Sequence, residues 1–230
     1  MSTGFIVDER NQLKEIRDPG FPPQPVTVRL AAKIISYIFH PVFVPVYIVV
    51  FMVYVHPYLF AGLSAGDKAL AVIRATLMYT FFPIVTVLLL KGLDFIKSIS
   101  LTSQKDRIIP LVACGVWYFW IWFVWRKLPE YPSTAIQLTL AIWISVSLGL
   151  MANIIMKVSL HAISMGVMLT FILLLAFAQQ IHFGMYISVS FLIAGAVCTS
   201  RFIASDHSPK EIYGGLFVGI ISMLAASLFG

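Results

Sequence analysis

The chain has 230 residues, of which 60% are hydrophobic and 11% are charged, and its net charge is +6. Soluble domains carry about 25% charged residues, so this composition excludes a water-soluble globular protein and predicts a polytopic membrane protein. The modest positive charge favours basic loops beside lipid headgroups, and we expect membrane lipids and no nucleic acid as partners.

The first 30 residues are polar and form a predicted N-terminal arm, which precedes a transmembrane domain over residues 31–230. Pro19, Pro22, Pro23 and Pro25 predict that this arm is extended or loosely docked. Two cysteines, Cys114 and Cys198, lie within apolar runs, which is typical of packing residues rather than of a disulfide or a metal site.

Seven apolar runs follow the arm, each close to the roughly 20 residues that a bilayer core requires. They cover residues 33–55, 69–91, 109–126, 134–155, 161–179, 184–200 and 211–229. We therefore predict an all-α fold, a polytopic transmembrane bundle of six to seven spans. His40, Pro41 and Pro45 interrupt the first run, which predicts a kinked or re-entrant start. His40 by itself is typical of an interfacial histidine.

Polar clusters stand at the starts of three later runs, at residues 107–110, 157–161 and 200–211. Two predicted crossings separate each cluster from the next, so all three lie on one side of the membrane with the arm. Each precedes a helix N-terminus, where backbone N–H groups and the helix dipole favour an anion. Together with Arg107, Arg201 and either Lys105 or Lys157, these termini predict a phosphate pocket.

The third cluster reads SRFIASDHSPKEIYGG, in which Ser200 and Arg201 are followed after five residues by His207 and after three more by Glu211. This pattern resembles the third motif of the type 2 phosphatidic acid phosphatase (PAP2) superfamily, where an Asp stands at the last position. In the second cluster, Ser159 and His161 keep the spacing of that family's Pro-Ser-Gly-His motif.

Several positions depart from the family patterns. Val158 and Leu160 replace the Pro and Gly of the second motif. The first motif is Lys, six residues, then Arg-Pro; Arg107 matches the Arg, while Ser100 stands where the Lys is expected. Lys97 or Lys105 could supply the missing positive charge. The resemblance covers residues 97–220 and implies a PAP2-like core within the helical bundle.

The resemblance implies a phosphatase that needs no metal or cofactor. His207 would be the nucleophile, Glu211 would orient it, and His161 would be the general acid. The residues implied to bind the phosphate of the substrate are Arg107, Arg201, Lys105, Lys157, Ser159 and Ser200. The substrate would be a membrane lipid that carries a phosphate monoester or a diphosphate.

Other interpretations of these residues remain open. Ser208, Pro209 and Glu211 also form a capping-box pattern, which alone could account for Glu211. Arg107 and Arg201 could be basic flanks that anchor spans at headgroups. The competing functions are a lipid phosphotransferase with the same phosphohistidine, and a non-catalytic lipid-phosphate binder or transporter. The sequence does not indicate an oligomeric state.

The resemblance to bacterial members implies a location in the bacterial inner (plasma) membrane. Twelve of the sixteen Lys and Arg residues lie on the predicted side of the site and four on the other. The positive-inside rule then predicts a cytoplasmic site. Bacterial members of the family commonly face the periplasm, so both orientations remain open at this stage.

Overall fold

The computed structural model describes residues 4–7, 13–16, 24–96, 98–99, 104–179, 182–204 and 207–229. Within these residues, six helices are long and apolar enough to cross a membrane. They are Ala65–Gly92, Gln104–Trp125, Ser133–Ile155, Leu160–Ala178, Gly184–Ala204 and Pro209–Phe229. The chain is therefore an integral membrane protein whose membrane domain is helical, and the last six predicted spans each match one helix.

The residues before the bundle form two strands and one helix. Strands β1 (Gly4–Val7) and β2 (Leu13–Ile16) pair antiparallel, with Gly4 opposite Ile16. Helix α1 covers Val26–Ile38 and starts directly after Pro25, whose extended backbone (φ −51°, ψ 149°) precedes the first turn. Helix α1 thus begins within the predicted arm, since it includes residues 26–30.

The first predicted span is not one continuous helix. After α1 the chain turns at residues 39–43 and then forms α2 (Val44–Val50), which continues as the π-helix η1 (Phe51–Val55). The carbonyl oxygen of His40 accepts hydrogen bonds from the backbone N–H groups of Phe43 and Val44, at 2.8 and 3.3 Å. Pro41 has no N–H to continue the ladder of α1, so the predicted interruption occurs here.

The next crossing is assembled from α3 (Ala65–Thr76), the π-helix η2 (Leu77–Phe81) and α4 (Phe82–Gly92), which are continuous. Ser64 caps its start by accepting a hydrogen bond from the backbone N–H of Asp67 at 3.2 Å. Pro83 is the second residue of α4, just after the π-helical segment, where the wider turn accommodates a residue without an N–H donor.

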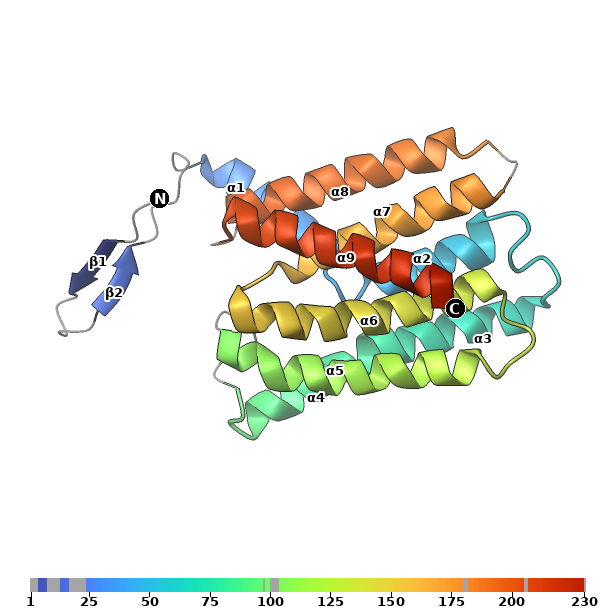
Figure 1. Ribbon diagram of the computed structural model, residues 1–230, viewed down its shortest axis with the longest axis horizontal. Coiled ribbons are helices and arrows are strands. Elements are labelled where there is room, and N and C mark those ends of the chain that lie inside the picture. Colours follow the sequence, from blue (N-terminus) through green and yellow to red (C-terminus); the bar gives the residue numbers. More distant parts are fainter. Residues whose placement is uncertain are drawn as a thin grey trace.

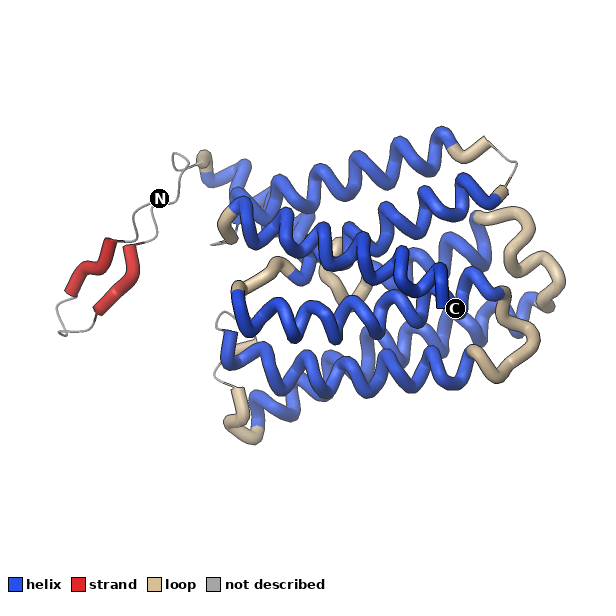
Figure 2. Tube along the Cα trace, viewed as in Figure 1, coloured by secondary structure: helices blue, strands red, loops and turns tan. Residues whose placement is uncertain are grey.

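The remaining five helices run antiparallel to their neighbours in the chain (Figure 1). They are α5 (Gln104–Trp125), α6 (Ser133–Ile155), α7 (Leu160–Ala178), α8 (Gly184–Ala204) and α9 (Pro209–Phe229). The loops gather at the two ends of the bundle (Figure 2). The N-termini of α5, α7 and α9 share one end, which confirms that the three polar clusters lie on the same side. We refer to it as the site end.

Helix α7 is the most buried of the six long helices. It packs closely against α9, because Gly166 and Gly219 let the two backbones approach. A Cβ on Gly219 would clash with the carbonyl oxygen of Ile163. This contact fixes the relative positions of the helices that carry His161 and Glu211.

Candidate functional site

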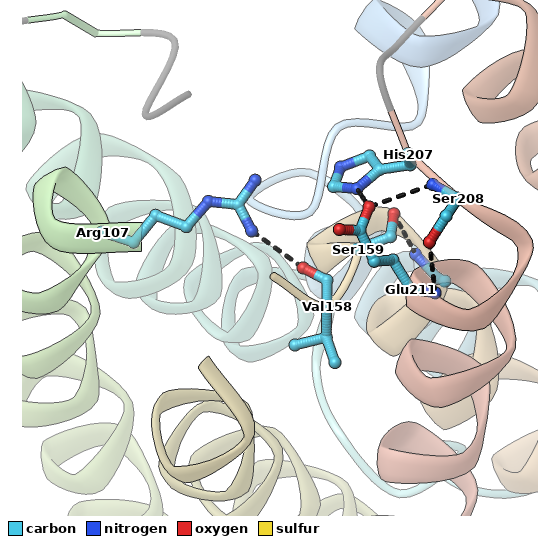
Figure 3. A network of polar contacts seen from close by, with 7 residues as sticks. Arg107, Val158, Ser159, His207, Ser208 and Glu211 are labelled. Atoms are coloured by element: carbon cyan, nitrogen blue, oxygen red, sulfur yellow. Dashed lines mark hydrogen bonds and ion pairs between the residues drawn. The ribbon is translucent and has the colours of Figure 1, made fainter. Parts of the chain in front are cut away.

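A histidine and a carboxylate lie in direct contact at the site end. His207 stands between α8 and α9, and its Nδ1 lies 2.9 Å from Oε2 of Glu211 in the first turn of α9 (Figure 3). Both residues are buried, with 9% of each exposed. The carboxylate accepts the Nδ1–H, which leaves the lone pair of Nε2 available as a nucleophile.

The same carboxylate also caps α9. Oε2 of Glu211 accepts a hydrogen bond from the backbone N–H of Ser208 at 3.0 Å, and the Ser208 hydroxyl accepts from the Glu211 N–H at 3.4 Å. These two bonds form a capping box, as the sequence indicated. Capping and orientation of His207 are therefore combined in one side chain, because the cap holds the carboxylate beside the imidazole.

The first and second polar clusters join at Arg107 and the segment before α7. Arg107, in the first turns of α5, is 6% exposed and donates from a terminal guanidinium nitrogen to the carbonyl of Val158 at 2.8 Å. The next residue, Ser159, donates its backbone N–H to the carbonyl oxygen of Glu211 at 3.0 Å. Figure 3 shows the Arg107 guanidinium directed toward this segment, with Glu211 and His207 beside it.

His161 lies in the first turn of α7 and is held from α1. Its Nε2 is 3.0 Å from the carbonyl oxygen of Ser36, an acceptor that requires the proton on Nε2. The Ser36 hydroxyl is 3.0 Å from the Ser200 hydroxyl on α8. Helix α1 thereby fixes the orientation of His161 and leaves Nδ1 as the nitrogen that can exchange a proton with a substrate.

A cavity of about 300 Å³ begins at these side chains and extends into the bundle. Its polar part is lined by His40, Arg107, His161, Arg201 and His207. Side chains of α2, α4, α5, α6 and α7 line the rest, and most of them are apolar, among them Ile48, Val87, Leu111, Ile142 and Val167. The arrangement can hold a molecule that has an anionic head and an apolar chain.

Four of the predicted site residues line this cavity, namely Arg107, His161, Arg201 and His207. Ser159 and Ser200 are 0% and 2% exposed and have other partners: Ser159 caps α7 by accepting from the Ala162 N–H at 3.4 Å, and Ser200 donates to the Val197 carbonyl at 2.7 Å. Neither hydroxyl is among the side chains that line the cavity.

The predicted lysines lie elsewhere. Lys105 is exposed on α5, and Lys157 is half-buried in the connection before α7, and neither lines the cavity. Lys97 lies outside the described residues. Within the part of the chain that is described, the two arginines are therefore the cationic side chains of the cavity.

Sequence reasoning missed two residues of this site. His40 lines the cavity, and its ring centroid is 5.3 Å from that of His161, edge to face. Ser36 contributes the carbonyl that holds His161. The break at His40 and Pro41 was the available signal, because it indicated irregular backbone, which membrane proteins place where it is buried or lines a cavity.

Burial is the main influence on His207, and it lowers the pKa of the imidazole to about 4. The charges of Arg201 and Arg107 lower this pKa as well, while Glu211 opposes them. The imidazole is consequently neutral near pH 7, the state in which Nε2 has its lone pair. Among the described residues, no group of three His, Cys, Asp or Glu side chains is placed to hold a metal ion.

Comparison of the chain with protein-family models, with curated proteins and with solved structures gives no match.

Proposed function

We propose that this protein is an integral-membrane lipid phosphatase that hydrolyses a phosphate monoester or diphosphate of a membrane lipid through a phosphohistidine. The observation that carries the proposal is the His207–Glu211 pair, which opens on the same cavity as His161, Arg107 and Arg201. A site that only binds an anion needs cations, whereas a carboxylate-oriented neutral histidine also supplies a nucleophile.

In the first step, the Nε2 lone pair of His207 attacks phosphorus, and the bond from phosphorus to the ester oxygen breaks. His161 enters this step protonated at both ring nitrogens, a state that the negative charge of the bound phosphate stabilises. The leaving oxygen takes the proton from Nδ1 of His161, while the Nε2–H stays on the Ser36 carbonyl. Glu211 stabilises the positive charge that develops on the imidazole of His207. Arg107 and Arg201 stabilise the negative charge on the phosphoryl oxygens.

In the second step, water attacks the phosphohistidine. His161, now neutral at Nδ1, takes a proton from the water as the new P–O bond forms. The P–N bond breaks, its electron pair returns to Nε2 of His207, and inorganic phosphate leaves. Both histidines then have their starting protonation states, so atoms, protons and charge balance over the cycle.

The apolar part of the cavity supports a lipid rather than a water-soluble phosphate ester. Ile84 and Leu88 of α4 line the cavity and are also 38% and 51% exposed, so the cavity adjoins the lipid-facing surface of the bundle. A chain that stays in the bilayer can reach the interior along this side. Each methylene that it buries contributes about 0.8 kcal/mol to binding.

We further propose that α5 to α9 are a PAP2-like core and that the protein belongs in a bacterial inner membrane, with the site facing the cytoplasm. The distribution of Lys and Arg, twelve on the side of the site and four on the other, supports this orientation. Lys157→Cys in a background without native cysteines tests it. A membrane-impermeant thiol reagent should label this position in inverted vesicles and not in intact cells.

The enzymatic proposal is tested with detergent-purified protein, a panel of lipid phosphates and EDTA throughout. Wild type should release inorganic phosphate, and His207→Ala should release none above background. Transfer of phosphate to an added lipid alcohol, without release to water, would instead identify a phosphotransferase. Tight binding of a lipid phosphate without any turnover would identify the binder or transporter.

A further inference from the structure

The turn between α1 and α2 brings a third histidine to the cavity. His40 stands in this turn, and its carbonyl accepts the first backbone hydrogen bonds on the α2 side, from Phe43 at 2.8 Å and Val44 at 3.3 Å. The next residue is Pro41, which restricts the backbone. The turn therefore has a defined geometry, and the imidazole of His40 lines the cavity together with the side chains of Pro41 and Val42.

Contacts with two motif-bearing helices hold this turn in place. One helical turn before His40, Ser36 bonds through its carbonyl to His161 of α7 and through its hydroxyl to Ser200 of α8, both at 3.0 Å. The His40 ring then meets the His161 ring edge to face, with centroids 5.3 Å apart. A residue anchored in this way can act on a ligand without a large conformational change.

The hydrogen bonding of His40 indicates which nitrogen faces a ligand as a donor. The backbone N–H of Val42 donates to Nδ1 of His40 at a long 3.5 Å, so the proton of the neutral ring is on Nε2. His40 is partly exposed, but the loss of solvent around its ring at the cavity lowers the pKa of the imidazole, and the charge of Arg201 on α8 lowers it further. The other ionisable side chains that line this cavity are Arg107, Cys114, Tyr118, His161 and His207.

We propose that His40 is a phosphate-contacting residue, which donates a hydrogen bond from Nε2 to an oxygen of the bound phosphoryl group. This inference rests on the proposed function to the extent that the cavity binds a lipid phosphate. His40 supplies a third donor beside Arg107 and Arg201, whereas Lys105 is exposed and does not line the cavity. None of the three sequence motifs contains it.

Binding of dodecyl phosphonate to the detergent-solubilised full chain, measured by calorimetry, tests the assignment. This ligand has an anionic head and an apolar chain and cannot be hydrolysed, so the result does not depend on turnover. A hydrogen bond to a charged group contributes enough that His40→Ala should weaken binding about 10- to 100-fold. His40→Gln should bind within about threefold of wild type, because the Gln amide nitrogen replaces Nε2 as a donor.

Two further variants complete the experiment. His182→Ala, at the exposed opposite end, should bind as wild type does. His40→Leu fills the space without a donor and replaces His40→Ala if the latter does not fold. Wild-type affinity in His40→Leu or His40→Ala would overturn the proposal, and so would equal losses in His40→Gln and His40→Ala. If binding depends on His40 but the protein hydrolyses no lipid phosphate, this inference is supported and the proposed phosphatase activity is ruled out.

Discussion

His207 and His56 stand at opposite ends of the bundle, and both are buried, but they differ in what holds them. Nδ1 of His56 accepts backbone N–H bonds from Tyr58 and Leu59 at 3.3 and 3.2 Å, and its ring packs near Phe51 and Phe183. His207 instead pairs with a carboxylate and lines a cavity. Burial alone therefore does not distinguish the two histidines; the carboxylate partner and the cavity beside His207 do.

The largest expected effect separates these two histidines. His207→Ala should abolish phosphate release from a lipid phosphate while the protein still folds, because Glu211 keeps the backbone N–H of Ser208 as a partner. His56→Ala should retain activity but lose about 1–2 kcal/mol of stability, because two backbone N–H groups lose their acceptor. Parallel assays of turnover and thermal unfolding check both. If His207→Ala retains more than a small percentage of wild-type activity, His207 is not the nucleophile.

Glu211→Gln tests the carboxylate that distinguishes the site end. The Gln amide can donate to Nδ1 of His207, which moves the imidazole proton to Nε2 and removes the nucleophilic lone pair. By analogy with other carboxylate–histidine pairs, kcat should fall about 10²- to 10⁴-fold. Glu211→Asp keeps the charge on a shorter side chain, and its kcat should fall less. If both variants turn over as wild type does, Glu211 only caps α9.

The apolar part of the cavity predicts a smaller effect that depends on the substrate. Cys114 lines the cavity on α5, so Cys114→Phe should displace about two methylenes of a bound chain, which corresponds to about tenfold in kcat/KM for a long-chain substrate. Hydrolysis of p-nitrophenyl phosphate should change little. Cys198→Phe, on α8 and not among the cavity-lining residues, is the matched control. Equal losses on both substrates would contradict a chain-binding cavity.

The smallest effect concerns pH. Protonation of Nε2 removes the nucleophile, so activity is lost as pH falls through the pKa of His207. Because burial, Arg201 and Arg107 lower this pKa to about 4, kcat/KM should stay on its plateau well below pH 6.5. A pH–rate profile recorded with a substrate that is ionised throughout this range checks it. An acidic limb centred at 6.5 would show that His207 is not in the environment described.

The sequence predicted the helices well because a long apolar run in a bilayer must satisfy its backbone hydrogen bonds internally, which a helix does. The last six runs became helices, and the span parity placed the three clusters at one end. The pattern from Ser208 to Glu211 also predicted the capping box. These features depend on local sequence and on the number of crossings, both of which can be read along the chain.

The contacts of individual side chains were not predictable in the same way. The sequence did not indicate that His40 lines the cavity. This position depends on the packing of α1 against α8, more than 150 residues later in the chain, as the bond between Ser36 and Ser200 shows. Ser159 and Ser200 keep motif spacing, yet packing gives their hydroxyls backbone partners. Spacing indicates which residues come together, whereas tertiary packing determines which of them line the cavity.

Chemical trapping tests the proposed transfer of phosphate to His207. Wild-type protein is mixed with a lipid phosphate labelled in the phosphoryl group, quenched within a turnover and analysed for protein-bound label. We expect a phosphate on His207 that is stable in base and labile in acid, formed in the presence of EDTA and absent from His207→Ala. Turnover with no trapped label at any quench time, or label that persists in His207→Ala, would contradict it.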